Sequence, residues 1–328
     1  MSNSKENLRI QRLVVIVGLV LFAIKLVAWY ITASVAILTD ALESTVNVVA
    51  SFIGLYSLIL SAKPRDMEHP YGHGKVEFIS AGIEGSLITV AGLVIIYEAI
   101  NNLRHPHEIG SLDYGILLVV LAAAVNYGVG LVAVKKGEKN NSLALIASGK
   151  HLQSDTYSSV GIIVGLAIMR FTGWAWVDSV VALIFAFVII FTGLKIVRSS
   201  IAGIMDEVDT ELLNKVVASL NEHREANWVD IHNLRIIKYG SVLHLDFHMT
   251  VPWYLNVNQA HDEVDKIDRL AKVEFGESVE MFVHTDGCMS FSCQICAKSD
   301  CQVRQANFVK QLEWTVGNIS SNQKHRLD

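Results

Sequence analysis

Six long apolar stretches constrain the fold of this chain more than any other feature. They lie at about 13–33, 36–60, 80–102, 112–134, 144–170 and 176–201. Each is long enough for a helix to cross a lipid bilayer, which takes ~20 predominantly apolar residues. The chain is 52% hydrophobic and 18% charged, which is too apolar for an ordinary soluble protein. The sequence therefore predicts a membrane α-helical bundle of six transmembrane helices within residues 1–204.

The composition changes at residue 205, and no later run is long enough to cross a bilayer. Apolar residues at helical spacing predict amphipathic helices at 209–223 and 256–276. Three β-rich segments predict strands at 228–240, 241–252 and 278–287, with a hairpin turn at Tyr239-Gly240-Ser241. The order αββαβ indicates a small α+β domain at 205–290, with its helices on one face of a sheet. Residues 291–328 would form a cysteine-containing C-terminal tail.

Basic residues are distributed unevenly between the two sides of the predicted bundle. The side rich in basic residues would carry Lys5, Arg9, Arg12, Lys63, Arg65, Lys75, Lys135, Lys136, Lys139 and Lys150. The poor side has only Arg104 and Arg170. Because loops rich in Lys and Arg stay on the cytoplasmic side, we expect both termini and the small domain in the cytoplasm. A multi-pass protein of a bacterial inner (plasma) membrane is the simplest reading, and its cytoplasmic thiols would stay reduced.

Residues that bind metal ions occur inside two of the apolar runs. Glu43 and Asn47 lie in the second run, and His151 and Asp155 in the fifth. Each pair has i, i+4 spacing, which places both side chains on one face of a helix, and Asp40 extends the first stripe. Such groups could also join helices by hydrogen bonds, but buried acids need a partner or a cation. Ionisable groups at membrane depth mark ion pathways, so a cation site is predicted here.

A second group lies in the loop after the second run. Asp66, His69 and His73 are close in sequence, and Gly72 and Gly74 permit a tight backbone. The group could hold a transition metal, or it could be a structured turn whose histidines cap the next helix.

A third group lies in the small domain. His232, His248 and His284 fall on three different predicted strands, and His261 lies on a helix. A sheet could bring them together with Asp286 as a zinc-type ligand set, although scattered surface histidines are the alternative.

Four cysteines follow the last predicted strand. They form the pattern Cys288-x4-Cys293-x2-Cys296-x4-Cys301. Cys-x2-Cys is a common element of zinc sites, so we favour metal binding over four reduced thiols in a flexible tail.

Several functional classes are excluded by missing motifs. The chain contains no H-E-x-x-H, no G-x-x-x-x-G-K-[ST] and no G-x-S-x-G, so nothing predicts an enzyme or ATP hydrolysis. The net charge of −5 argues against a nucleic-acid partner. Any transport would be driven by ion gradients.

Taken together, the apolar runs, the ligand pairs on the second and fifth, the motif HPYGHGK at 69–75 and the αββαβ domain resemble the cation diffusion facilitator family. The bacterial zinc/ferrous-iron efflux transporters are the most similar branch, over about residues 10–290. The resemblance implies a homodimer that exchanges a divalent cation for protons by alternating access. The alternative is a membrane-tethered metal sensor or regulator without transport.

The resemblance also implies roles for these residues. The transport site would be Glu43, Asn47, His151 and Asp155, with Asp40 as a further candidate ligand. The family usually has His or Asp, then Asp, where this chain has Glu43 and Asn47. The cargo would be Zn²⁺ or Fe²⁺ first, because imidazole suits these ions, with Mn²⁺, Co²⁺ and Cd²⁺ as further candidates. Oxygen-rich ligand sets favour harder cations such as Mn²⁺.

Three other implied sites lie outside the bundle. The loop site would be Asp66, His69 and His73. A structural or regulatory Zn²⁺ would be bound in the cytoplasmic domain by His232, His248, His261, His284 and Asp286. Lys75 and Asp206 would form an ion pair that locks the membrane part to the soluble part.

Overall fold

The computed structural model describes residues 2–32, 35–104, 113–172, 176–240, 242–276 and 278–327. Its contacts divide the chain into two compact units, residues 1–205 and 206–328, and each is described by itself.

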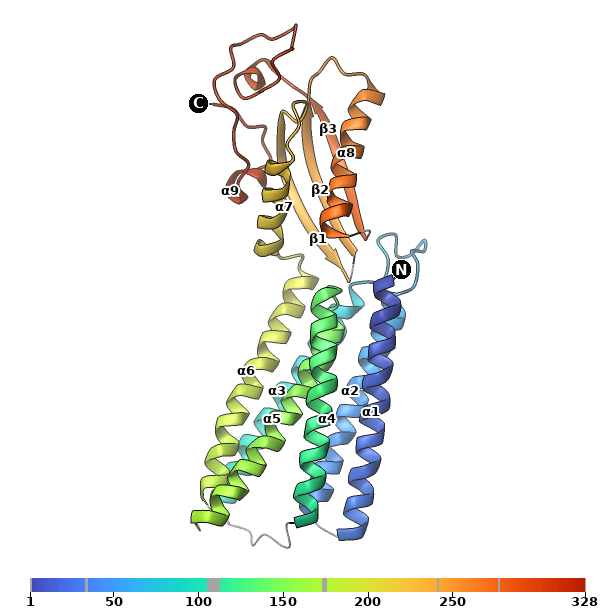
Figure 1. Cartoon of the computed structure of the whole chain (residues 1–328), viewed down its shortest axis with the longest axis vertical. Coiled ribbons are helices and arrows are strands. Elements are labelled where there is room, and N and C mark those ends of the chain that lie inside the picture. The colour runs from blue at the N-terminus through green and yellow to red at the C-terminus, as the bar shows by residue number, and fades with distance from the viewer. Residues whose placement is uncertain are drawn as a thin grey trace. The chain divides into compact units, whose positions relative to one another are not determined.

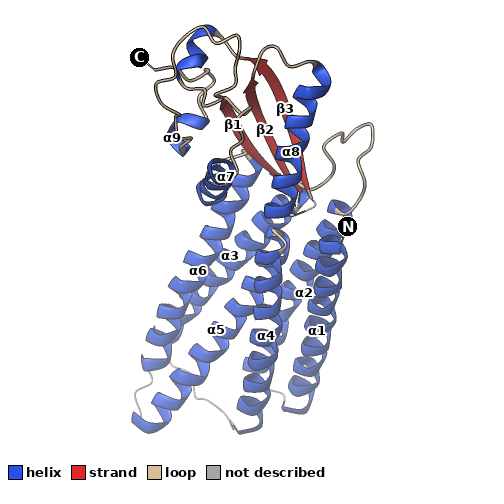
Figure 2. Cartoon of the chain, turned by 45° about the horizontal axis from the view of Figure 1, so that its top comes forward, coloured by secondary structure: helices blue, strands red, loops and turns tan. Residues whose placement is uncertain are grey.

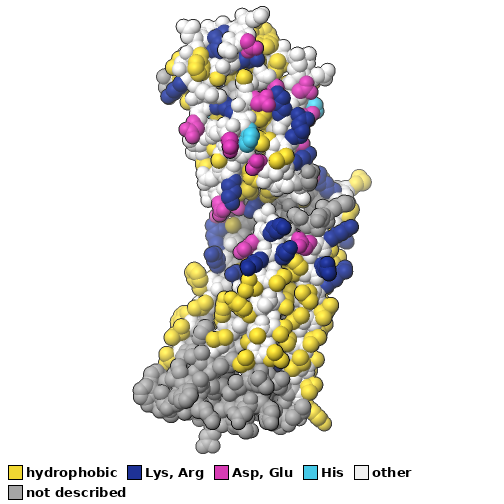
Figure 3. All heavy atoms as spheres, in the orientation of Figure 1, with side chains coloured by type: hydrophobic (Ala, Val, Ile, Leu, Met, Phe, Trp, Pro, Cys, Tyr) yellow, Lys and Arg dark blue, Asp and Glu magenta, His cyan; other side chains and the backbone are white. Residues whose placement is uncertain are grey.

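The first unit is a bundle of long helices (Figure 1). The helices are α1 (Ser2–Thr32), α2 (Val35–Ser61), α3 (Val76–Arg104), α4 (Asp113–Lys139), α5 (Leu143–Thr172) and α6 (Trp176–Ile204). Within the described residues, four helices are long and apolar enough to cross a membrane, at Lys5–Val27, Val76–Asn101, Val120–Lys139 and Ala186–Ile204. Helix α2 has a shorter apolar stretch, Val48–Ser61. Figure 3 shows hydrophobic side chains over the outer faces of these helices, which suits contact with lipid.

Pairs of glycines bring two pairs of helices into close contact. A Cβ atom at Gly149 of α5 would lie 2.8 Å from the carbonyl oxygen of Gly130 in α4, and the reverse distance is also 2.8 Å. A Cβ atom at Gly85 of α3 would lie 2.9 Å from the carbonyl oxygen of Gly193 in α6. Small residues allow helix backbones to approach closely inside a membrane. The α4–α5 contact fixes the part of α5 that carries His151.

The second unit has the predicted αββαβ order. Its elements are α7 (Thr210–Glu222), β1 (Asp230–Tyr239), β2 (Val242–Val251), α8 (Val257–Phe275) and β3 (Val279–Gly287). Strand β2 lies in the middle of the sheet, antiparallel to β1 and parallel to β3. Gly240 has the positive φ of 59° expected in the β1–β2 turn, whereas Ser241 lies outside the described residues. Helices α7 and α8 cover one face of the sheet (Figure 2), and their apolar stripes pack on it as one core.

The C-terminal tail is packed into this core. It contains a short 3₁₀ helix, η1 (Ser290–Gln294), and a single helical turn, α9 (Val316–Ile319). Trp314 is 1% exposed and belongs to the core cluster with Ile319. The Arg224 guanidinium lies 3.8 Å from the centre of the Trp314 ring and donates to the Leu312 carbonyl at 2.5 Å. The tail is therefore a structural part of the second unit.

Candidate metal sites

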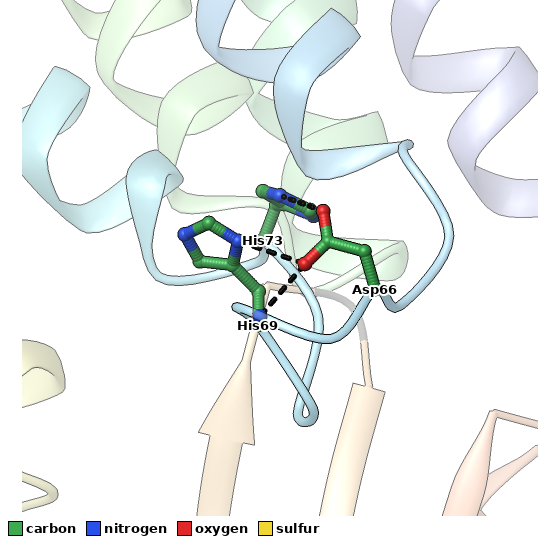
Figure 4. Close-up of side chains that lie close together, drawn as sticks. All are labelled: Asp66, His69 and His73. Carbon is green, nitrogen blue, oxygen red and sulfur yellow. Dashed lines mark hydrogen bonds and ion pairs between the residues drawn. The ribbon is translucent and has the colours of Figure 1, made fainter.

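The loop after α2 holds one compact ligand group, Asp66, His69 and His73. One ligand atom from each residue lies within 4.8 Å of the other two. Nδ1 of His69 is 3.0 Å from Oδ1 of Asp66, and Nε2 of His73 is 3.5 Å from Oδ2 (Figure 4). The carboxylate thus lies between two imidazoles, and a divalent cation could replace the protons that these groups share.

The backbone of this loop places the three side chains. The backbone N–H groups of Glu68 and His69 donate to Oδ1 of Asp66 at 3.1 and 2.7 Å. Hydrogen bonds from the His69 backbone and side chain hold the pKa of Asp66 below its usual range. Gly72 has a φ of +88°, a conformation that favours glycine, and this turn brings His73 back beside His69. Nδ1 of His73 is buried and has no hydrogen-bond partner in the described part of the chain, and Nε2 is the ring atom that faces Asp66.

A second group lies on the sheet of the cytoplasmic unit. His232 of β1 is in register with His248 of β2, which is in register with His284 of β3. Asp286 lies two residues after His284, on the same face of the strand. One carboxylate oxygen of Asp286 is 3.7 Å from Nε2 of His232 and 3.5 Å from Nδ1 of His248. His232, His248 and Asp286 are within 4.8 Å of one another and fit a zinc ion by donor type.

The other two predicted members of this cluster are less closely placed. His284 is 65% exposed, and its Nε2 is 3.7 Å from the second carboxylate oxygen of Asp286. His261 on α8 is 71% exposed and lies 3.7 Å from Asp265. Neither belongs to the compact group found among the described residues. Their ligand roles remain predictions.

Asp230 is a site residue that the sequence argument missed. Its Oδ2 is 3.4 Å from Nδ1 of His232, and its Oδ1 is 2.6 Å from Nδ1 of His325 near the C-terminus. Burial alone would raise the pKa of Asp230, but the His232 imidazole at 3.4 Å and hydrogen bonds from His325 hold it well below its usual range. A carboxylate behind a ligating imidazole orients the ring toward the metal. The sequence could have identified Asp230, because residues at i and i+2, such as Asp230 and His232, lie on the same face of a strand.

The tail also reaches Asp286 itself. Nζ of Lys324 is 3.3 Å from Oδ1 of Asp286 and donates to the Gly287 carbonyl at 3.1 Å. This ammonium group therefore occupies part of the carboxylate that a metal ion would bind.

The predicted transport site is described only in part. His151 on α5 is 4% exposed, and Asp155 follows one helical turn later and is partly exposed. The backbone of α2 carries Asp40, Glu43 and Asn47, but their side chains lie outside the described residues. The four-residue site therefore remains a prediction.

A buried polar network lies on the same helix face as His151. Glu84 of α3 is fully buried and accepts hydrogen bonds from Ser148 Oγ at 3.0 and 3.1 Å. Nε2 of Gln11 donates to Ser148 Oγ at 3.0 Å. A Cβ atom at Gly54 would lie 2.7 Å from each of these three side chains, so only glycine leaves room for the network. The sequence shows Glu84 as an acid within an apolar run, but it does not predict the hydrogen-bond partners of this residue.

The remaining predicted residues are not assembled by the described structure. The four cysteines are free thiols, and they are not among the described groups whose ligand atoms all lie within 4.8 Å of one another. Lys75 and Asp206 belong to different units, so their ion pair remains a prediction.

Comparison with known protein families covers both units. A family model of the cation efflux transmembrane domain matches residues 12–205. A model of the cytoplasmic domain of cation efflux proteins, a dimerisation domain, matches residues 208–288. These matches confirm the predicted fold, and the dimerisation domain implies a homodimer.

Individual relatives are similar along most of their length. An uncharacterised transporter of Synechocystis sp. is 37% identical over 76% of this chain and 81% of its own. The cation-efflux pump FieF of Shewanella oneidensis is 25% identical over 82% of this chain and 90% of its own. The manganese efflux system protein MneP of Bacillus subtilis is 27% identical over 87% of this chain and 98% of its own.

Proposed function

The chain belongs to the cation efflux family, whose members are membrane transporters and not enzymes, and from this premise we propose that it exports a divalent transition-metal ion in exchange for protons. The observation that carries the proposal is the His151–Asp155 pair, an imidazole and a carboxylate one turn apart in a helix of the transmembrane domain. Ionisable side chains within a transmembrane helix have an energetic cost that an inert anchor would not need to bear.

The cargo is bound by Glu43 and Asn47 of α2 together with His151 and Asp155 of α5. Glu43 and Asp155 supply oxygen ligands, His151 supplies nitrogen, and Asn47 supplies a neutral oxygen. Zn²⁺ and Fe²⁺ suit an imidazole-containing set, whereas the second carboxylate also suits Mn²⁺. One relative is a manganese efflux protein, which makes Mn²⁺ the first alternative cargo.

Proton exchange follows from the chemistry of the ligands. His151 must be neutral and the two carboxylates ionised before they can bind a cation, so metal binding displaces protons. The bundle then opens to the opposite side, where protons compete with the cation and are carried back. A carrier suits this site better than a channel, because a fast pore must bind its ion weakly.

The cytoplasmic cluster senses metal in this scheme. His232, His248 and Asp286 hold Zn²⁺ with Asp230 behind His232, and His284 completes the set. Zn²⁺ bound there would join three strands of the dimerisation domain, and this links the cytoplasmic metal level to the transporter's conformation. The loop group Asp66, His69 and His73 would bind a further ion beside the membrane domain.

The test is metal-driven proton flux in proteoliposomes that contain an interior pH dye. Zn²⁺, Fe²⁺, Mn²⁺, Co²⁺, Ni²⁺ and Cd²⁺ are added one at a time. We expect a saturable proton signal for one or two ions, lost in Asp155→Ala and in His151→Ala. Ser159→Ala, one turn further along α5, is the matched control and should retain it.

Absence of flux with every ion would overturn the proposal if the protein still binds metal. The chain would then be a membrane-tethered metal sensor.

A further inference from the structure

The four cysteines lie in a loop with a defined backbone. The Cys288 backbone N–H donates to the Val251 carbonyl at 2.8 Å, which joins the start of the loop to the end of β2. Helix η1 then carries Cys293, and Ile295 anchors the next residues with 1% exposure. Cys296 is 8% exposed. A flexible tail would not bury these side chains.

Arg304 closes the loop by binding three of its carbonyl oxygens. Nη1 donates to Cys293 at 2.8 Å, and Nη2 donates to Cys296 at 3.0 Å and to Lys298 at 2.6 Å. The guanidinium therefore brings a positive charge into the middle of the cysteine loop. A nearby cation stabilises thiolates relative to thiols.

Hydrogen-bond donors also point at the sulfur atoms. The Gln305 backbone N–H donates to Sγ of Cys293 at 3.4 Å. The Trp253 backbone bonds Cys288, and the Tyr254 side chain bonds Cys301. Cys288 and Cys301, the first and last of the four cysteines, thus both contact the Trp253–Tyr254 turn.

We propose that Cys288, Cys293, Cys296 and Cys301 form a tetrathiolate site for Zn²⁺, separate from the transport site and from the histidine cluster. Four thiolates make a closed site, without a position for substrate, which is typical of structural zinc. On binding, the four thiols release four protons to solvent and the cysteines remain reduced. The site carries a net charge of −2, which Arg304 and the N–H donors offset in part.

Zinc binding requires a local contraction of the loop. Zn–S bonds of about 2.3 Å place tetrahedral sulfurs ~3.8 Å apart, closer than the described cysteines lie. The segment from Cys296 to Cys301 has no regular secondary structure and can supply this movement. Metal would then fix the first part of the tail whose end places Lys324 and His325 at Asp286 and Asp230.

Cobalt spectroscopy on the purified full chain tests the site directly. Co²⁺ bound by thiolates gives sulfur-to-metal charge-transfer bands in the near ultraviolet. The chain contains 4 cysteines in total, so these bands can come only from this loop. We expect them in the wild type and in His248→Ala, which removes the imidazole cluster instead, and we expect their loss in Cys293→Ser/Cys296→Ser. Zinc analysis should show one fewer ion per chain in the double variant.

A second measurement needs no variant and covers the case in which the double variant misfolds. Zn²⁺ should slow the reaction of all four wild-type thiols with a thiol-reactive dye, and a strong chelator should restore it. The proposal is overturned if the wild type shows no thiolate bands, or if Zn²⁺ leaves the thiols equally reactive. Because these are binding measurements, a failure of proton flux would not affect them.

Discussion

At the scale of single residues, the zinc site proposed for the cytoplasmic unit should depend on a carboxylate, Asp230, that would not bind the metal itself. Asp230 lies 3.4 Å from Nδ1 of His232 and fixes the ring so that Nε2 faces Asp286. We expect Asp230→Asn to weaken Zn²⁺ binding at this site ~10- to 100-fold, as loss of such second-layer partners does. Competition with a chromophoric chelator would measure it. Asp246→Asn, a half-exposed acid on β2, is the control; equal affinities in the two variants would contradict the role of Asp230.

Lys324 should have the opposite effect on the same site. Its ammonium group lies 3.3 Å from Asp286 and must leave, at least in part, before a cation binds that oxygen. We expect Lys324→Gln to tighten Zn²⁺ binding by about threefold to tenfold, because one repulsive charge is removed. Lys310→Gln, an exposed lysine of the same tail, should leave the titration unchanged. Weaker binding in Lys324→Gln would show that the lysine supports the site instead.

The histidines of this cluster could be predicted from the sequence, whereas the two tail residues that reach it could not, for a physical reason. Strand patterns place His232, His248 and His284 on separate strands, and the register then aligns them. Lys324 and His325 reach the site only because Trp314 anchors the tail, a tertiary contact with no local signal. Glu84 shows the same limit inside the bundle, since its partner Ser148 comes from α5, and Gln11, which donates to Ser148, comes from α1.

At the scale of elements, the contact between α4 and α5 positions the helix that carries His151 and Asp155. A methyl group at Gly149 would meet the backbone of Gly130 and Val134 at 2.8 Å, so Gly149→Ala must separate the two helices. We expect a loss of stability of ~1–3 kcal/mol and a strong loss of metal flux, because His151 lies two residues away. Gly128→Ala on α4 has nothing within 4 Å of the added Cβ and is the matched control. Thermal unfolding and proteoliposome flux that are unchanged in Gly149→Ala would disprove this contact.

The packed tail is the second prediction at this scale. Trp314 is 1% exposed within the core, and its backbone N–H and carbonyl both bond the Asn221 side chain. We expect Trp314→Ala to destabilise the cytoplasmic unit by ~3–5 kcal/mol. Hydrogen exchange on the full chain should report faster exchange in β1 and α7. Phe308→Ala removes an exposed aromatic ring from the same tail and should leave exchange unchanged; similar behaviour of the two variants would mean that the tail is not part of the core.

The elements themselves followed closely from the sequence. Apolar runs gave the six helices because backbone groups in lipid must be satisfied within the segment. The αββαβ order followed from the change of hydrophobic period, and the confirmed family match agrees with it. The sequence pattern did not predict which helices pack against each other. Close contacts such as that between Gly130 and Gly149 depend on two glycines in different apolar runs.

At the scale of the whole molecule, the proposed antiport predicts that the number of protons exchanged per cation depends on the charge of the proposed transport site. The proposed site has Asn47 where the family usually has an acid, and an amide cannot bind or release a proton near neutral pH. We therefore expect Asn47→Asp to increase the protons released per metal ion by up to one, since the new carboxylate must lose its proton before it binds the cation. The ratio of proton flux to metal flux in the same vesicles measures this, with Asn47→Ser as the uncharged control. A ratio that is equal in all three proteins would place Asn47 outside the set of groups that carry protons, and Glu43, His151 and Asp155 would then account for the exchange alone.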